Sequence, residues 1–312
     1  MFSEIKGIGA HLPGKELDNE EVIAIKGIDT SDKFIRERFG VQKRRVIEGG
    51  EKNSDLGAEA LKKAAEKAGI TLKEIDAIVC ATMTPEKPSP STACIIQGKL
   101  GLKGVPAFDV SAACSGFVYG LDSAARMVSG GEYKNIALVA TETMSKIVDW
   151  SDRVVCPVFG DAGTATIVSH SKKEKVLATH LTADGGGSGV LHVPENEKFL
   201  RMNGKDVYEF AVKLFPETAR KTVKKAGIGL KDIDWVFPHQ ANINIIRDGM
   251  KELGLGMEKT HLNMQKYGNT AAASIPLAIE EAERIGKVKK GDLLLCVGFG
   301  AGWSAGGAVV EW

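Results

Sequence analysis

A ten-residue segment occurs twice in this chain. Lys-Ala-Gly-Ile-Thr-Leu-Lys-Glu-Ile-Asp at 67–76 returns at 225–234 as Lys-Ala-Gly-Ile-Gly-Leu-Lys-Asp-Ile-Asp, identical at eight of ten positions. The copies start 158 residues apart, at 67 and 225, which is about half of the 312 residues. A repeat at this spacing predicts two fused copies of one fold, related by a pseudo-twofold axis.

Differences between the two copies are the first place to look for function. The same offset carries Cys114 onto Ala272, in the segment Gly268–Ser274, and carries His239 back onto Ala81. Each half therefore supplies a different polar group near equivalent positions. A pseudo-twofold axis would bring these groups together at the centre of the molecule.

Charge and cysteine content exclude several classes of protein. The formal net charge is +1, which gives no global attraction to nucleic acid, and no apolar run reaches the 18 residues of a membrane span. The start of the chain, 1–6, lacks a signal-peptide pattern. The five cysteines are odd in number and widely spaced, so neither a disulfide framework nor a metal site is expected. These features fit a reducing cytoplasm.

Strand and helix signals alternate in the same order in both halves, which predicts an α/β protein with helices on the sheet faces. We expect the halves to meet near 169–175, so that 1–170 and 171–312 form the two domains with a broad interface. The expected helices are 54–68, 117–129, one broken or started near Pro216, 242–253 and 270–285. The expected strands are 75–81, 105–110, 136–140, 234–237 and 293–297.

Cys114 lies between an expected strand and an expected helix. A thiol at a helix N-terminus feels the positive end of the dipole and free backbone N–H groups, and both lower its pKa. Small neighbours such as Ala113 and Gly116 leave room for a substrate. The alternative is a small cysteine that only packs at a tight strand-to-helix join.

Two polar residues of the second half complete a candidate site. His239 ends a strand, where ligands bind in α/β sheets, although a histidine satisfied by nearby backbone would look the same. Asn269 stands between Gly268 and a helix start, where capping chemistry is the alternative. Under the duplication, Asn269 and Cys114 lie at nearly equivalent helix starts. The three residues together predict one site.

At these residues the chain resembles a known family. The segments 109–117, 239–242 and 267–276 are similar to the three signatures of β-ketoacyl-acyl-carrier-protein synthase III, and 158–163 and 298–303 resemble two further landmarks. The resemblance runs in order from Gly7 to Trp312. It implies the thiolase-like fold, in which two duplicated α/β halves form a layered α-β-α-β-α sandwich, and a homodimer whose central sheet continues between subunits.

The resemblance implies a decarboxylative condensation that initiates fatty acid synthesis. Cys114 would take an acyl group from acyl-coenzyme A, with backbone N–H groups of Cys114 and Ala301 holding the oxyanion. His239 and Asn269 would donate hydrogen bonds to the thioester oxygen of malonyl-acyl-carrier protein as carbon dioxide leaves. The acyl-cysteine would then be attacked, giving a 3-oxoacyl thioester. Acyl-coenzyme A is a substrate here, and neither a cofactor nor a metal is expected.

The resemblance also implies substrate contacts. Phe34, where the family usually has tryptophan, and Arg153 would sandwich the adenine of coenzyme A, and Arg38 would meet a phosphate. For Arg38 the alternative is a solvated charge. The full set of coenzyme A contacts implied by the resemblance is Thr30, Phe34, Arg38, Arg153, Tyr208 and Asn242.

Three departures from the family pattern bear on substrate and partner. Ser89 stands where acetyl-preferring members have a bulky aromatic that closes the acyl tunnel across the dimer interface, which leaves room for a longer or branched primer. Glu209 and Asn244 stand where many members have basic residues that meet the acidic carrier protein. Arg247, together with Lys251 or Lys224-Lys225, would substitute for them, with an ordinary solvated helix face as the alternative.

Related activities fit less well. A thiolase would have Gly-His-Pro where this chain has Ser274-Ile275-Pro276, and hydroxymethylglutaryl-coenzyme A synthase would need a glutamate near Met83. A condensing acyltransferase of secondary metabolism that uses another acceptor stays open because of the carrier-side departures. From a different class, a non-catalytic scaffold would bind acyl-coenzyme A without forming an adduct. The glycine-rich segment 185–189 lacks a phosphate-loop ending and is expected to be a flexible loop.

Overall fold

Two β-sheets organise the chain in the computed structural model, which describes residues 1–312. The five-stranded sheet has the order β1 (Phe2–His11), β7 (Asp161–Ser171), β6 (Asn135–Thr143), β4 (Ala77–Ala81) and β5 (Ala107–Val110). The four-stranded sheet has the order β11 (Trp235–Pro238), β12 (Leu293–Gly300), β13 (Ser304–Glu311) and β8 (Val176–Thr182). The chain crosses from the first sheet to the second between β7 and β8, at 172–175.

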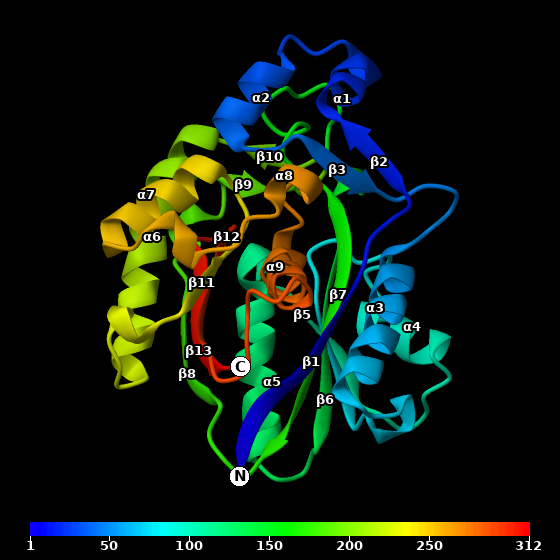
Figure 1. Ribbon diagram of the computed structural model, residues 1–312. Coiled ribbons are helices and arrows are strands. Elements are labelled where there is room, and N and C mark those ends of the chain that lie inside the picture. The colour runs from blue at the N-terminus through cyan, green and yellow to red at the C-terminus, as the bar shows by residue number, and fades with distance from the viewer.

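Helices cover both sheets and fill the space between them (Figure 1). The central layer is α5 (Gly116–Ser129) and α9 (Ser274–Arg284), each in contact with strands of both sheets. On the outer faces lie α3 (Asn53–Ala68) and α4 (Thr92–Lys99) for the first sheet, and α6 (Gly204–Lys225) and α7 (Ile243–Leu253) for the second. The predicted α-β-α-β-α sandwich is confirmed.

Shorter elements gather at one end of the sandwich, the upper end in Figure 1. Two small antiparallel ladders lie there, β2 with β3 and β9 with β10. These elements roof the region where the central helices begin. Their bounds are α1 (Asn19–Lys26), α2 (Asp32–Phe39), α8 (Met264–Tyr267), β2 (Lys15–Asp18), β3 (Lys43–Val46), β9 (Leu191–His192) and β10 (Arg201–Met202).

The 158-residue offset holds well beyond the repeated segment. The 3-10 turns at Leu72–Glu74 and Leu230–Asp232 are related by it. Asp76 accepts a hydrogen bond from the Asn135 backbone N–H at 2.9 Å, and Asp234 accepts the equivalent bond from Leu293 at 2.8 Å. Because side chains and backbone repeat in register, the two halves are structural duplicates at this level.

The expectation of a helix break or start near Pro216 is wrong. The helix expected to be broken or started near Pro216 is α6, which begins at Gly204 after the N-cap Asn203 and continues through Pro216 to Lys225. A proline inside a helix removes one backbone hydrogen bond and costs about 3 kcal/mol. Pro216 and its neighbour Phe215 are buried on the face that packs against the second sheet, and this burial offsets the local penalty.

The core is shared between the halves. A cluster of 21 buried residues includes Phe117 and Leu121 of α5, Ile275 and Ile279 of α9, and Phe237 of β11. Since residues from both halves interleave in this cluster, neither half keeps the central layer to itself. The N-terminal ends of α5 and α9 are thereby fixed relative to one another.

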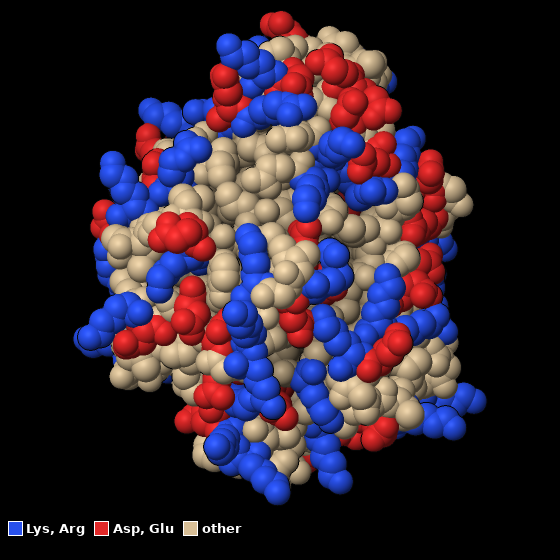
Figure 2. All heavy atoms as spheres, in the orientation of Figure 1, with Lys and Arg blue, Asp and Glu red and all other residues tan.

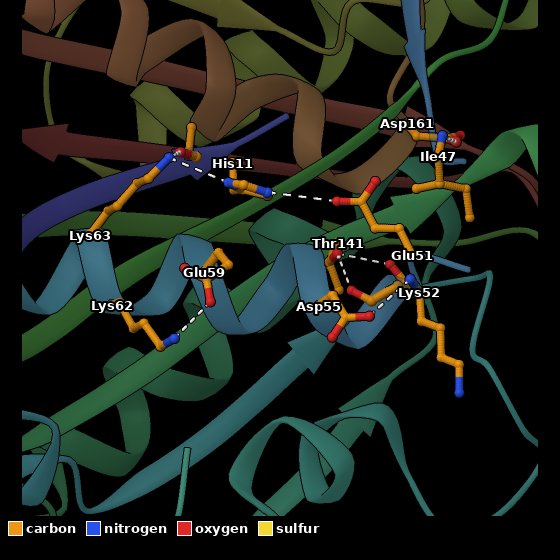
Figure 3. A network of polar contacts seen from close by, with 12 residues as sticks. His11, Ile47, Glu51, Lys52, Asp55, Glu59, Lys62, Lys63, Thr141 and Asp161 are labelled. Carbon is orange, nitrogen blue, oxygen red and sulfur yellow. Dashed lines mark hydrogen bonds and ion pairs between the residues drawn. The ribbon is translucent and has the colours of Figure 1, made fainter. Parts of the chain in front are cut away.

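Polar contacts tie α3 to the strands beside it (Figure 3). Lys63 of α3 contacts His11 of β1 at 3.4 Å, and His11 faces Glu51 at 3.7 Å. Inside the sheet, Thr141 of β6 donates to Asn53, the first residue of α3, at 2.8 Å. These contacts fix α3 against β1 and β6.

Charges of both signs alternate over the face drawn in Figure 2. Across the molecule many charges are paired, as in Lys67 with Glu283 and Lys266 with Glu281, both at 2.5 Å. Pairing of this kind limits the field of either sign. Measured against the thickness of a bilayer, none of the helices combines enough length with enough apolar character to span it.

Close contact between α3 and β1 depends on glycine. A Cβ at Gly9 would lie 2.3 Å from the Ala64 backbone nitrogen, whereas one at Gly14 would meet nothing within 4 Å. We therefore expect Gly9→Ala to lower the free energy of unfolding by about 1–3 kcal/mol in urea denaturation. Gly14→Ala is the matched control and should change it by less than about 0.5 kcal/mol. Equal effects of the two variants would contradict this packing.

Candidate active site

Cys114, His239 and Asn269 line one cavity of about 340 Å³. They come from separate elements: Cys114 from the 3-10 turn before α5, His239 from the end of β11, and Asn269 from the segment before α9. All three are nearly inaccessible, at 5, 1 and 5 % exposure. The three residues singled out in the sequence therefore converge.

Backbone geometry places Cys114 at a sharp turn. The preceding Ala113 has φ +47°, in the left-handed region that costs a non-glycine residue about 1–2 kcal/mol. Ala271, its equivalent at the 158-residue offset, has φ +46°. On the other side Gly300 packs so closely that a Cβ there would lie 2.8 Å from the Cys114 nitrogen. Both copies keep the strained turn, but only the first has a thiol on it.

The expectation of a lowered thiol pKa is wrong. Burial raises the pKa of Cys114 to about 12, and the nearby Glu142 carboxylate raises it further. The N-terminus of α5 opposes this by favouring the thiolate. Desolvation of the anion is the larger effect because the sulfur lies almost entirely out of water. Cys114 therefore rests as a thiol.

His239 is neutral and oriented. Its Nδ1 lies 2.7 Å from the Ser274 hydroxyl, whose oxygen also faces the Gln240 backbone N–H at 3.4 Å. Burial lowers the pKa of His239 to about 3, so no charge develops on the ring at neutral pH. With Ser274 donating to Nδ1, the ring carries its proton on Nε2 and has one N–H to offer to the cavity.

Asn269 is held in a similar way. Its Oδ1 accepts a hydrogen bond from the Ala271 backbone N–H at 2.8 Å, which leaves the Nδ2 amide group as a donor for the cavity. Its own backbone bridges to Val158 and Gly160 at 2.8 and 3.0 Å. The capping contact expected as an alternative is therefore present, and it orients the amide. Two neutral donors face one thiol.

Predicted coenzyme A contacts form the outer part of the same cavity. Five of the six line it: Phe34, Arg38, Arg153, Tyr208 and Asn242. Phe34 is 52 % exposed, so an apolar ring stands free at the surface. Thr30 is not part of the lining.

Several of these residues also have structural contacts. Asn242 donates to the Arg38 carbonyl at 3.0 Å and caps α7, and Arg153 donates to the Asp29 carbonyl at 3.0 Å. Tyr208 hydrogen-bonds Asp248. The outer cavity is thus built by contacts between α2, α6 and α7.

Other predicted residues lie outside this cavity. Ala301 follows Gly300, which is part of the lining, and Ser89 lies in the exposed loop before α4. Arg247 and Lys251 are on the exposed face of α7. Their proposed roles all involve backbone groups or a second protein surface, and they stay predictions. No group of three or more His, Cys, Asp or Glu side chains is placed to hold a metal ion.

The sequence analysis missed Glu142, a fully buried carboxylate near Cys114. It accepts hydrogen bonds from the Thr84 hydroxyl at 2.6 Å, the Met83 N–H at 3.1 Å and the Thr82 hydroxyl at 3.2 Å. Burial raises the pKa of Glu142 to about 7, although these bonds oppose the shift. The duplication relates Glu142 to the site: the residue 158 positions later is Gly300, which packs against Cys114.

Fold and site together define a thiolase-like condensing enzyme. The family model described as 3-oxoacyl-[acyl-carrier-protein (ACP)] synthase III matches residues 108–185, and the model of its C-terminal part matches 223–312. A β-ketoacyl-[acyl-carrier-protein] synthase III of Clostridium acetobutylicum is 42 % identical, over 99 % of this chain and 98 % of the relative. The chain belongs to the β-ketoacyl-acyl-carrier-protein synthase III family.

Solved structures agree. The 3-oxoacyl-[acyl-carrier-protein] synthase III of Aquifex aeolicus superposes with a TM-score of 0.96 at 40 % identity, covering 99 % of this chain and all of that one. The priming β-ketosynthase of the R1128 polyketide pathway gives 0.95 at 34 % identity, covering 99 % and 96 %. Both likenesses extend over the whole length of the chain.

Glu142 should make stability depend on pH. Its pKa rises from 4.5 to about 7 on folding, so its ionisation opposes the folded state as pH rises through this interval. Relative to Glu142→Gln, the wild type should therefore lose roughly 3 kcal/mol of stability between pH 4.5 and 7.5. Urea denaturation at several pH values measures this difference.

Asp122→Asn is the matched control, since Asp122 is also buried, at 9 % exposure. Burial raises its pKa, but hydrogen bonds from Arg126 and Thr179 outweigh this and hold the pKa below its usual value of 3.8. Its contribution is lost only as pH falls through that range, so the control difference should be flat from pH 5 to 7.5. A flat difference for Glu142→Gln as well would contradict the raised pKa.

Proposed function

We propose that this chain condenses an acyl-coenzyme A primer with malonyl-acyl-carrier protein and so initiates fatty acid synthesis. The observation that supports this most is the convergence of one buried thiol and two neutral, oriented donors in a single cavity. Family membership and full-length likeness to proteins named for this activity add to it. No resident cofactor is required, because both substrates bring their own thioester.

Cys114 is the proposed nucleophile of the first half-reaction. Its sulfur attacks the thioester carbonyl of the primer, a new S–C bond forms, and coenzyme A leaves as its thiol with the proton that Cys114 gives up. Backbone N–H groups of Cys114 and Ala301 would hold the oxyanion of the tetrahedral intermediate. One such donor is worth roughly 3–4 kcal/mol of transition-state stabilisation.

His239 and Asn269 act in the second half-reaction. The Nε2–H of His239 and the Nδ2–H of Asn269 donate to the thioester oxygen of the malonyl group while its C–CO₂ bond breaks. The enolate carbon then attacks the acyl-Cys114 carbonyl, and the S–C bond breaks to return the thiol after uptake of a proton. Neutral donors suit this step because the negative charge is delivered by the substrate.

The outer part of the cavity is the proposed coenzyme A channel. Phe34 and Arg153 both line it, as a pair that encloses an adenine ring must, and Arg38 lies beside them. Tyr208 and Asn242 would line the pantetheine path further in. Thr30, outside the lining, would contact the nucleotide at the surface.

The carrier protein would dock near α7. Arg247 and Lys251 are exposed there, and Asn244 accepts a hydrogen bond from Arg247 at 3.1 Å. Lys205 pairs with Glu209 at 3.9 Å, so the acidic residue partly neutralises a nearby lysine. This weaker basic surface favours, as a second candidate, a condensing acyltransferase of secondary metabolism with another acceptor. The R1128 priming β-ketosynthase is, by its name, a relative from a polyketide pathway.

We also propose a homodimer that acts in the cytoplasm. Strand β5 is one of the two edges of the first sheet, and its Phe108 is 39 % exposed. An exposed edge with an apolar residue is a template for pairing with a second copy. Pairing there would continue the sheet between subunits and bring the loop of Ser89 towards the partner's cavity. The five cysteines, all free, fit a reducing compartment.

Substitution of Cys114 and of His239 should separate the acylation step from the condensation step. Incubation with acyl-coenzyme A should add one acyl group to the wild type and none to Cys114→Ala, as weighed by intact-protein mass spectrometry. His239→Ala should still acylate but lose condensation with malonyl-carrier protein by about 10²-fold or more. Cys94→Ala, at a half-buried cysteine outside the cavity, is the control. Loss of acylation in His239→Ala would show this division of labour to be wrong.

Primer length should depend on Ser89. If this small residue leaves the acyl tunnel open, competition among straight C2 to C12 and branched acyl-coenzymes A should favour primers longer than acetyl. Ser89→Phe should shift the preference towards acetyl, since an aromatic ring would fill the tunnel. Unchanged selectivity in this variant would rule out the proposed tunnel.

A further inference from the structure

The turn that joins β12 to β13 is anchored to the nucleophile at both ends. At its start Gly300 packs against the Cys114 backbone. At its end the Ser304 hydroxyl lies 2.8 Å from the Ser115 hydroxyl and 3.3 Å from the Ala112 carbonyl, on either side of Cys114. The position of the three residues between these anchors, 301–303, therefore decides where their backbone N–H groups lie relative to the sulfur.

The last of these residues has an unusual conformation. Trp303 has φ +45°, directly after Gly302 at φ +68°. The left-handed region costs a non-glycine residue about 1–2 kcal/mol, and for a bulky side chain it is rare. Something must hold Trp303 in place, because a return to ordinary φ would rotate the turn away from Cys114.

Two neighbours enclose the indole of Trp303. Phe210 of α6 stacks on it, with ring centroids 3.8 Å apart and planes at 23°. The second neighbour is Gly187, which has no room for a side chain, since a Cβ there would lie 2.1 Å from the indole. Gly187 is buried in the 3-10 turn Gly185–Gly187, which Asp184 caps by accepting from the Gly186 N–H at 2.9 Å. The loop expected at 185–189 therefore contains a capped turn.

The energies are of comparable size. An aromatic pair contributes about 0.5–1.5 kcal/mol beyond the burial of its surface, close to the penalty of the left-handed backbone. The stack is therefore large enough to offset the strain of the turn. Both Phe210 and Trp303 line the cavity, so the stacked pair lies at the site itself.

We propose that Trp303, clamped between Phe210 and Gly187, is a positioning residue that fixes the Ala301–Gly302 backbone beside Cys114 for oxyanion binding. This inference rests on the proposed function, because it assigns a support to the oxyanion site of that reaction. It also explains the glycine-rich segment, whose third residue must lack a side chain for the indole to fit. The segment contributes to the chemistry through contact with the indole.

A double-mutant cycle tests the clamp. Gly187→Ala should push the indole off its seat and slow single-turnover acylation of Cys114 by acyl-coenzyme A about tenfold, with the Kd for acyl-coenzyme A unchanged. Gly189→Ala is the matched control in the same segment, since a Cβ there meets nothing within 4 Å, and its rate should equal the wild type's. In a Trp303→Leu background, already slow, Gly187→Ala should have little further effect.

The outcomes separate the two proposals. Equal slowing by Gly187→Ala in both backgrounds, or no slowing in either, overturns the clamp while an acylated wild type keeps the proposed function. A change in Kd with an unchanged acylation rate also overturns the clamp, because it would mean that Trp303 contacts the bound substrate without positioning the turn. If Trp303→Leu misfolds, Trp303→Phe provides the second background: its smaller ring keeps the stack but leaves room at Gly187, so Gly187→Ala should slow acylation less there than in the wild type. Absence of an adduct in the wild type would overturn both proposals.

Discussion

The close approach of two helix starts at the centre of the molecule determines everything around the site. A Cβ at Gly116, the first residue of α5, would lie 3.2 Å from Ala81 and 3.3 Å from Ala272. Only small residues stand at this contact, so the starts of α5 and α9 meet almost backbone to backbone. Cys114 and Asn269 are brought into one cavity because each lies just before one of these starts.

Burial sets the electrostatics of this centre. The thiol of Cys114 and the imidazole of His239 are both held neutral, with pKa values of about 12 and 3, because each charged form would be desolvated. The polar groups next to Cys114, those of His239 and Asn269, are therefore fixed dipoles. Such groups act most strongly on charge that develops in a substrate, where they need no reorganisation. This is the physical reason that neutral donors, rather than an ion pair, share the inner cavity with the thiol.

Much of this arrangement was predictable from the residues. The repeat at 67–76 and 225–234 implied the duplication, and local patterns placed Cys114 and Asn269 at nearly equivalent helix starts and His239 at a strand end. Local patterns failed where tertiary packing competes with them. Pro216 looked like a helix break until the burial of its face was known, and the pKa of Cys114 depends on desolvation that no sequence window reports. Glu142 and Trp303 were missed because their partners are distant in the chain.

The duplicated turn at Ala271 has a consequence for how such a molecule can evolve. It repeats the conformation of Ala113, yet the residue after it is Ala272, without a reactive group. One chain thus keeps two copies of the same turn, and only the copy at Ala113 is followed by a cysteine. The copy at Ala271 carries no reactive group, and its side chains pack against the turn that carries Cys114. Because the second half also supplies His239 and Asn269 to the cavity, the freedom to vary belongs to the turn at Ala271–Ala272 and not to the whole half.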